Sequence, residues 1–233
     1  MLISPPRHVS RPAGPGRATL YIGAVSAVIA AVSYSSFLLS PWTHAASSAG
    51  GGFISELEDP GQPFAWLYRA SDVSAGVGVL VAAWVVRRLV AGRWAAGGTA
   101  LLALAGGSSV LDAATSMQCD PGTSARCARD EHTPLGLLGQ LLYLHTDSGL
   151  LGFVAAAAGA AVLGAAMAGR WPPWGRLQIA LGIGIASCGL AELIVLLLAG
   201  SIGTAVRVQV LLTSGWFLAI GLFLAARARN SPV

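Results

Sequence analysis

The sequence predicts an all-α, polytopic membrane protein: a six-transmembrane-helix bundle with both termini cytoplasmic. Three observations lead to this prediction. The 233-residue chain contains six long apolar runs. Only 10% of its residues are charged, against roughly 25% in a soluble domain, and its mean hydropathy is +0.68. Most of its arginines and all of its acidic residues fall at opposite ends of the apolar runs.

Each apolar run can cross a hydrocarbon core of about 30 Å, which takes roughly 20 residues of helix. In chain order, we expect helices over residues 18–39, 66–86, 94–117, 145–169, 177–200 and 204–226. Continuous apolar runs of this length exclude the alternating strands of a membrane barrel. The first run has a basic start, but its apolar core of about 22 residues exceeds the roughly 7–15 of a secretory signal. We therefore expect it to be retained as a helix.

The rest of the chain consists of tails and loops. Residues 1–17, rich in proline and arginine, are expected to form a disordered cytoplasmic tail. Residues 18–226 form the predicted transmembrane domain, and residues 227–233 a second cytoplasmic tail.

The arginines orient the bundle. Ten of the 14 lie in segments at one end, and four, Arg69, Arg126, Arg129 and Arg207, lie at the other. The positive-inside rule places the first end in the cytoplasm, and none of the ten acidic residues falls in a segment predicted to lie there. We expect a multi-pass protein of the cell (plasma) membrane with membrane lipids as partners. The pI near 9.4 comes from arginines at helix ends, so no nucleic-acid partner is expected.

Small residues recur at four-residue spacing, as in Ala160/Gly164 and Gly182/Ala186. In lipid this spacing lets helices approach closely. Close packing inside one bundle explains the pattern, and the pattern also leaves open a homo-oligomer or a membrane-protein partner.

Ionisable residues inside a membrane are costly and are therefore functional candidates. At about 1.5 Å per residue, Asp72 lies about 22 Å, Glu192 about 24 Å and Asp112 about 28 Å from the arginines that mark the predicted inner boundary. His145 and Arg207 fall near the outer boundary. We therefore predict one outward-opening site. Its candidate ligand-binding residues are Asp72, Asp112, His145, Glu192, Arg207, Arg69 and Glu56. In the alternative, each acid makes its own contact, for example Asp72 with Arg69 and Asp112 with Arg207.

His145, Asp72 and Asp112 are also the candidate catalytic residues, with His145 and a carboxylate as an acid/base pair. No metal or other cofactor is expected, because the chain has no His-x-x-x-His or Cys-x-x-Cys pair. A zinc site made by His145 with Asp72 and Asp112 remains the weaker alternative. Serine catalysis could draw on Ser55, Ser71 or Ser148, and no motif chooses among them.

Cys119 and Cys127 flank a turn on the predicted outer side, and extracytoplasmic space is oxidising. We therefore predict a disulfide between them. We expect Cys188, within the predicted fifth helix, to be a small buried apolar residue.

Several short motifs together resemble one known family. They are Ser55-Glu56-Leu57, residues 66–72, Leu111-Asp112-Ala113-Ala114, residues 117–121, Leu144-His145, and Arg207-Val208-Gln209 ahead of Trp216. This pattern is similar to the bacterial membrane proteins catalogued as domain of unknown function 998, which are common in actinobacteria. The resemblance covers most of the chain after the N-terminal tail. It implies six helices and an integral membrane location, and it implies no established activity.

A more distant likeness is to the ceramidase-like transmembrane hydrolases, seven-helix proteins with a three-His zinc site. This chain departs from that pattern in having six expected helices and no His pair. Three classes of function therefore stay open. The protein binds or moves a lipid or amphipathic ligand in an outward-facing acidic pocket, or it is a membrane-embedded hydrolase or transferase acting on a lipid, or it is a structural or accessory subunit of a membrane assembly.

Overall fold

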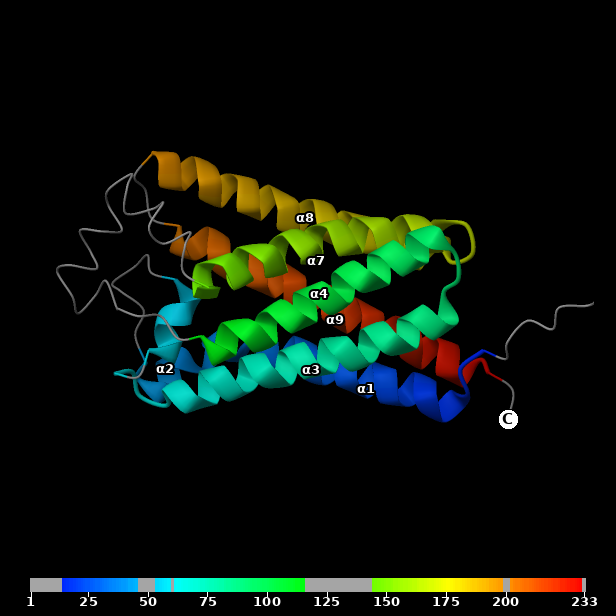
Figure 1. Cartoon of the computed structure of the whole chain (residues 1–233), viewed down its shortest axis with the longest axis horizontal. Coiled ribbons are helices and arrows are strands. Elements are labelled where there is room, and N and C mark those ends of the chain that lie inside the picture. Colours follow the sequence, from blue (N-terminus) through cyan, green and yellow to red (C-terminus); the bar gives the residue numbers. More distant parts are fainter. Residues whose placement is uncertain (1–13, 46–52, 60, 116–143, 199–201, 232–233) are drawn as a thin grey trace, which may run out of the picture.

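The computed structural model describes residues 14–45, 53–59, 61–115, 144–198 and 202–231. Every regular element in these ranges is a helix. Six of the described helices are long and apolar enough to cross a membrane, and they run alongside one another in Figure 1. The prediction of an all-α bundle of six membrane helices is therefore confirmed. Most of the predicted N-terminal tail and both Cys119 and Cys127 lie outside the described residues.

The long helices begin and end close to the predicted positions. They are α1 (Arg17–Tyr34), α3 (Ala65–Leu89), α4 (Arg93–Ala114), α7 (Leu144–Ala168), α8 (Pro172–Leu197) and α9 (Gly203–Arg229). The largest differences are at the end of α1 and the start of α8. α1 ends at Tyr34, where Ser35 Oγ donates to the carbonyl oxygen of Ala31 at 3.0 Å, and the chain continues as η1 (Ser36–Leu39) and α2 (Ser40–Thr43). α8 starts at Pro172 because a proline in the first helical turn lacks only an N–H that has no helical partner.

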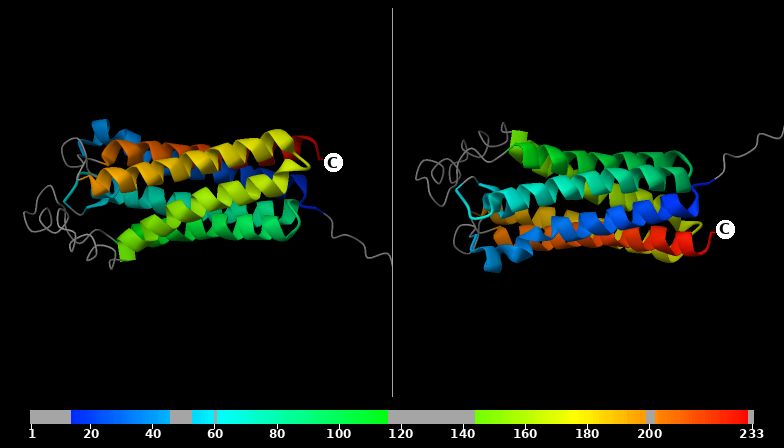
Figure 2. Two further views of the ribbon diagram at one scale, coloured as in Figure 1. Left: turned by 90° about the horizontal axis from the view of Figure 1, so that it is seen from above. Right: turned by 90° about the horizontal axis from the view of Figure 1, so that it is seen from below.

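The six long helices form a closed ring. Each packs against the next long helix in the chain, and α9 packs back against α1, as the two views in Figure 2 show. α9 is the most buried, with 61% of its most apolar stretch inside the protein, and α8 is the least, with 11%. α8 is therefore the helix that is most open to its surroundings, whereas α9 supplies much of the core through Trp216, Phe223 and Leu224.

Glycines bring neighbouring backbones into contact. A Cβ atom on Gly76 would lie 2.5 Å from the carbonyl oxygen of Gly106, so α3 and α4 pack backbone to backbone. A Cβ atom on Gly164 would lie 2.7 Å from the carbonyl oxygen of Gly175, and one on Gly182 would lie 2.8 Å from that of Ala157. The small residues at four-residue spacing thus serve α7–α8 packing within one chain. Association between chains stays a prediction.

The arginine-rich segments meet at one end of the bundle. The start of α1, the α3–α4 turn, the α7–α8 turn and the end of α9 lie together there in Figure 1. Two of these arginines stack on tryptophans: the guanidinium carbon of Arg88 lies 4.1 Å from the Trp84 ring centroid, and that of Arg170 lies 4.8 Å from the Trp171 ring. The helix ends nearest the two termini therefore share one end of the bundle. That this end is cytoplasmic stays a prediction.

The opposite end is covered in part by the short helix η2 (Ile54–Glu58), which packs on α3 and α9. Leu57 is buried there in an apolar cluster with Phe37, Tyr68 and Val206. The backbone N–H of Phe53 donates to Glu56 Oε1 at 3.0 Å and holds the start of η2. This anchoring turns the last residue of η2, Glu58, into the protein, with only 5% of its surface exposed.

Candidate functional site

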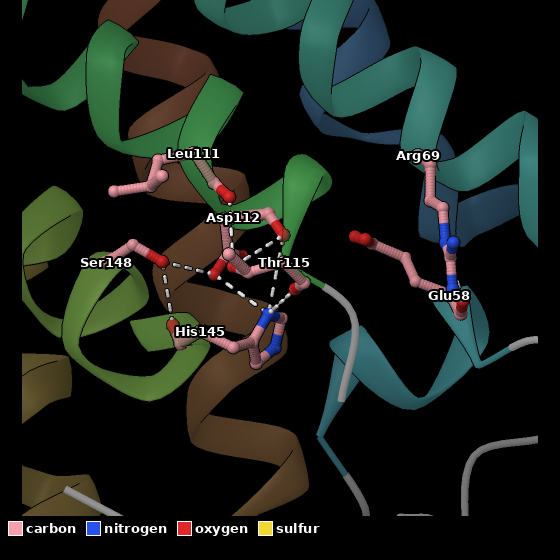
Figure 3. Close-up of polar contacts among 7 residues, drawn as sticks. All are labelled: Glu58, Arg69, Leu111, Asp112, Thr115, His145 and Ser148. Carbon is pink, nitrogen blue, oxygen red and sulfur yellow. Dashed lines mark hydrogen bonds and ion pairs between the residues drawn. The ribbon is translucent and has the colours of Figure 1, made fainter. Parts of the chain in front are cut away.

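A polar contact joins α4 to α7 at the end of the bundle away from the arginine-rich segments. Ser148 Oγ donates to Asp112 Oδ1 at 2.9 Å, and His145 Nδ1 lies 3.1 Å from the same oxygen. His145 Nδ1 also lies 2.8 Å from the carbonyl oxygen of Thr115. Because both partners of Nδ1 are acceptors, this nitrogen carries the proton. Figure 3 shows the three side chains turned toward one another.

A small cavity lies beside this contact. Its polar lining comes from five helices: Tyr34, Asp72, Ser108, Ser109, Asp112, Ser148 and Thr213. The cavity measures about 20 Å³, which is room for about one water molecule. Two acidic residues, one on α3 and one on α4, thus line one small space that is large enough for a single small polar group.

A third carboxyl group reaches this region from η2. The side chains of Glu58 and Asp72 lie close enough to influence each other electrostatically. Glu58 Oε2 is buried and has no hydrogen-bond partner among the described residues. Arg69 donates through Nε at 2.9 Å and Nη2 at 2.6 Å to the carbonyl oxygen of Glu58, as Figure 3 shows. Arg69 therefore secures the backbone of η2.

The surroundings of Glu58 favour its neutral form. Burial raises the pKa of the Glu58 carboxyl, and the negative charge of Asp112 acts in the same direction. The hydrogen bond from Asp72 and the nearby charges of His145 and Arg69 lower the pKa, but burial is the largest effect and the net shift is upward.

The arrangement of Ser148, Asp112 and His145 differs from a catalytic triad. In a triad the imidazole accepts the serine proton and the carboxylate orients the imidazole. Here Ser148 Oγ donates to Asp112 and to the carbonyl oxygen of His145. The imidazole is therefore not placed to activate Ser148. Among the residues that the structure describes, no three His, Cys, Asp or Glu side chains come together in a group that could hold a metal ion. The alternative zinc set of His145, Asp72 and Asp112 is accordingly not assembled there.

The structure brings together three of the predicted site residues and separates others. Asp72 and Asp112 line the cavity, and His145 contacts Asp112. Neither Glu192 nor Arg207 lines it. Glu192 lies on α8, which packs against α7 and α9 and away from α3, and Arg207 donates to the carbonyl oxygen of Gly203 at 2.9 Å.

The two remaining candidates have local structural contacts. Glu56 holds the start of η2, and Arg69 turns to the backbone of Glu58. The predicted pairing of Arg69 with Asp72 is thereby replaced, since the guanidinium reaches toward the overlying η2 helix. The predicted pairing of Asp112 with Arg207 is replaced as well, because Asp112 contacts Ser148 and His145.

Sequence reasoning missed Glu58. Three acids, Glu56, Glu58 and Asp59, stand close together in one loop, and no local pattern distinguishes them. Tyr34 and Thr213 were also missed, because a single tyrosine or threonine in an apolar run carries no signal of its partner helices.

The six apolar helices with a buried acidic site define a multi-pass integral membrane protein. The family model for a protein of unknown function (DUF998) matches residues 18–222, and the chain belongs to this family. No curated protein and no solved structure matches the chain.

Proposed function

We propose that this protein binds or moves a lipid or another amphipathic ligand, whose polar group enters the acidic cavity at the predicted outer end of the bundle. The observation that supports this most directly is that Asp72 and Asp112, from two helices, line one small cavity. Burying a carboxyl group in a membrane protein is costly, and packing a bundle does not require two at one point. Binding a ligand or a proton that offsets the charge of Asp72 and Asp112 would explain why both carboxyl groups are present at this point.

The seam between α4 and α7 offers a route for the apolar part of such a ligand. Gly149 and Gly152 line the cavity on the α7 side, and a Cβ atom on Gly149 would still lie 3.8 Å from Asp112 Oδ1. Leu111 and Leu150 are 39% and 54% exposed on the outside of these two helices. An acyl chain lying against them would place its polar group at the cavity.

The size of the cavity limits what enters it. Space for about one water admits the tip of a polar group and excludes a whole phosphate-bearing headgroup. A ligand that penetrates further requires α4 and α7 to separate. Whether the protein only binds the ligand or also moves it, binding between α4 and α7 is the first step. Movement across the membrane would be a second step.

A catalytic role is the second candidate, and the contact between His145 and Asp112 supports it. A His–carboxylate pair can act as an acid/base pair in hydrolysis or group transfer on a lipid. The chemistry would use the imidazole Nε2 atom, because Nδ1 is engaged by Asp112 and Thr115.

Native mass spectrometry of the protein released from lipid nanodiscs tests the proposal. We expect the wild type to retain a lipid that Asp72→Asn and Asp112→Asn release. Asp147→Asn is the matched control, because Asp147 is an exposed carboxylate on α7 and its variant should retain the lipid. Equal retention by all four proteins would contradict the proposal. Release of a cleaved headgroup that stops in His145→Gln would favour the catalytic candidate.

A further inference from the structure

We propose that the polar group held in this cavity is a primary ammonium, bound between the carboxyl groups of Asp72 and Asp112 with Glu58 behind Asp72. The ammonium belongs to a lipid headgroup or to another aliphatic amine. This inference rests on the proposed function and names the chemistry that the same site selects.

Of the three carboxyl groups near the cavity, only that of Asp112 has an ion-pair partner among the described residues. Three carboxyl groups, Glu58, Asp72 and Asp112, lie close enough to influence one another. The cationic side chains nearby are already engaged: His145 Nδ1 binds Asp112 and Thr115, and Arg69 donates to the backbone carbonyl of Glu58. Buried carboxylates in excess of their cationic partners must bind protons or a cation. A proton on Glu58 meets part of this requirement, and a cationic ligand between Asp72 and Asp112 would meet the rest.

Unused acceptor atoms lie at and beside the cavity: Asp112 lines it, and Glu58 lies near the lining residue Asp72. Glu58 is 5% exposed, and its Oε2 atom has no hydrogen-bond partner among the described residues. Figure 3 shows its carboxyl group directed toward the α4 side of the site. The described contacts of the Asp112 carboxyl group all involve Oδ1, which leaves Oδ2 as a further acceptor. The site thus offers carboxylate acceptors and needs donors.

Size and donor number select among cations. An ammonium group has three N–H donors and is about as large as the single water for which the cavity has room. A trimethylammonium group is larger than this space and has no N–H donor. Quaternary amines are typically held by aromatic cages, whereas the lining of this cavity combines carboxyl and hydroxyl groups with small apolar residues and two aromatic rings, Tyr34 and Phe217.

Glycine at position 149 keeps the approach to Asp112 open. A Cβ atom there would lie 3.8 Å from Asp112 Oδ1, an ordinary van der Waals distance. Gly149→Ala therefore places a methyl group against the carboxylate without a clash. On the neighbouring helix, a Cβ atom on Gly107 would meet nothing within 4 Å, so Gly107→Ala is the matched control.

The test is a binding titration of the full-length protein in detergent with short-chain phosphatidylethanolamine, its trimethylated analogue phosphatidylcholine, and free ethanolamine. We expect phosphatidylethanolamine to bind at least about tenfold more tightly than phosphatidylcholine. Asp112→Asn, Asp72→Asn and Gly149→Ala should reduce that preference, while Asp147→Asn and Gly107→Ala should keep it. The melting temperature of each variant establishes that it is folded.

The outcomes separate the inference from the function on which it rests. Binding of ethanolamine alone would make a soluble amine the ligand, and binding of phosphatidylethanolamine alone would make it a lipid headgroup; both support the inference. Equal binding of the two lipids that is lost in the Asp variants would refute the ammonium preference and leave the acidic pocket in place. Binding that no Asp variant changes, or no saturable binding at all, would refute the pocket and the inference together.

Discussion

His145 Nδ1 lies 3.1 Å from Asp112 Oδ1 and joins α7 to the C-terminal end of α4. The same nitrogen contacts the carbonyl oxygen of Thr115, the residue that caps α4. Carbonyl groups at a helix C-terminus lack helical partners, so the imidazole satisfies one of them while it holds the carboxylate. Ser148, one turn along α7, donates to the same carboxylate oxygen. The geometry of the acidic cavity therefore depends on the α4–α7 contact.

Removing the hydroxyl group of Ser148 should weaken this contact. We expect Ser148→Ala to lower the free energy of unfolding by about 1 kcal/mol, the usual net value of one hydrogen bond. Thermal unfolding in detergent measures the change. The control is Ser74→Ala, because Ser74 is exposed and bonds only to Ala70 of its own helix in the described contacts. A similar loss in both variants would contradict the interhelical role of Ser148.

Glu58 should make stability depend on pH. Its raised pKa means that the folded protein binds the proton more tightly than the unfolded chain. Its stabilising contribution is complete below the ordinary glutamate value of 4.5 and is lost as the pH rises through the raised value. Glu58→Gln mimics the neutral form, so we expect a flatter profile of melting temperature against pH above 4.5. Asp147→Asn should keep the wild-type slope, and an unchanged slope in Glu58→Gln would count against a buried proton at this position.

Gly76 should tolerate no side chain. A Cβ atom there would lie 2.5 Å from the carbonyl oxygen of Gly106 and 2.6 Å from Val110 Cγ2, so Gly76→Ala must push α3 and α4 apart. We expect a loss of roughly 1–3 kcal/mol, as for other overpacked sites. Gly107→Ala should be neutral, or more stable by up to about 1 kcal/mol through helix propensity. Equal melting temperatures for the two variants would show that α3 and α4 pack less closely.

The orientation of the bundle can be tested with single cysteines. After the three native cysteines are replaced by serine, Gly169→Cys reports on the α7–α8 turn and Gly61→Cys on the loop before α3; both positions are exposed. The positive-inside rule predicts that a membrane-impermeant maleimide labels Gly61→Cys in intact cells and leaves Gly169→Cys unlabelled until the cells are lysed. The reverse pattern would invert the predicted topology.

The predicted bridge between Cys119 and Cys127 requires a chemical test. Peptide mass spectrometry of protein purified without reductant should find the two cysteines linked, and reduction should separate them. Two free thiols would show that the prediction is wrong.

The sequence alone determined the helices, their antiparallel order and the separation of arginines from acids. These properties are local, because the length of an apolar run sets the length of a membrane helix and the rise per residue sets the depth of each side chain. Asp72 and Asp112 accordingly lie at the end that was predicted for them. The end of α1 and the start of α8 differed, since serine hydrogen bonds and proline geometry act within a single turn.

Only the tertiary structure decided which acids meet. Depth along a helix says nothing about the direction in which a side chain points around the bundle. Glu192, at a predicted depth like that of Asp72, lies on α8 and does not line the cavity. Glu58 lies near Asp72 because η2 folds over the end of α3. For the same reason Arg69 donates to the carbonyl oxygen of Glu58 and not to Asp72 on its own helix. These contacts depend on how the six helices close into a ring and on packing between distant segments. A local pattern of residues in the sequence does not predict either.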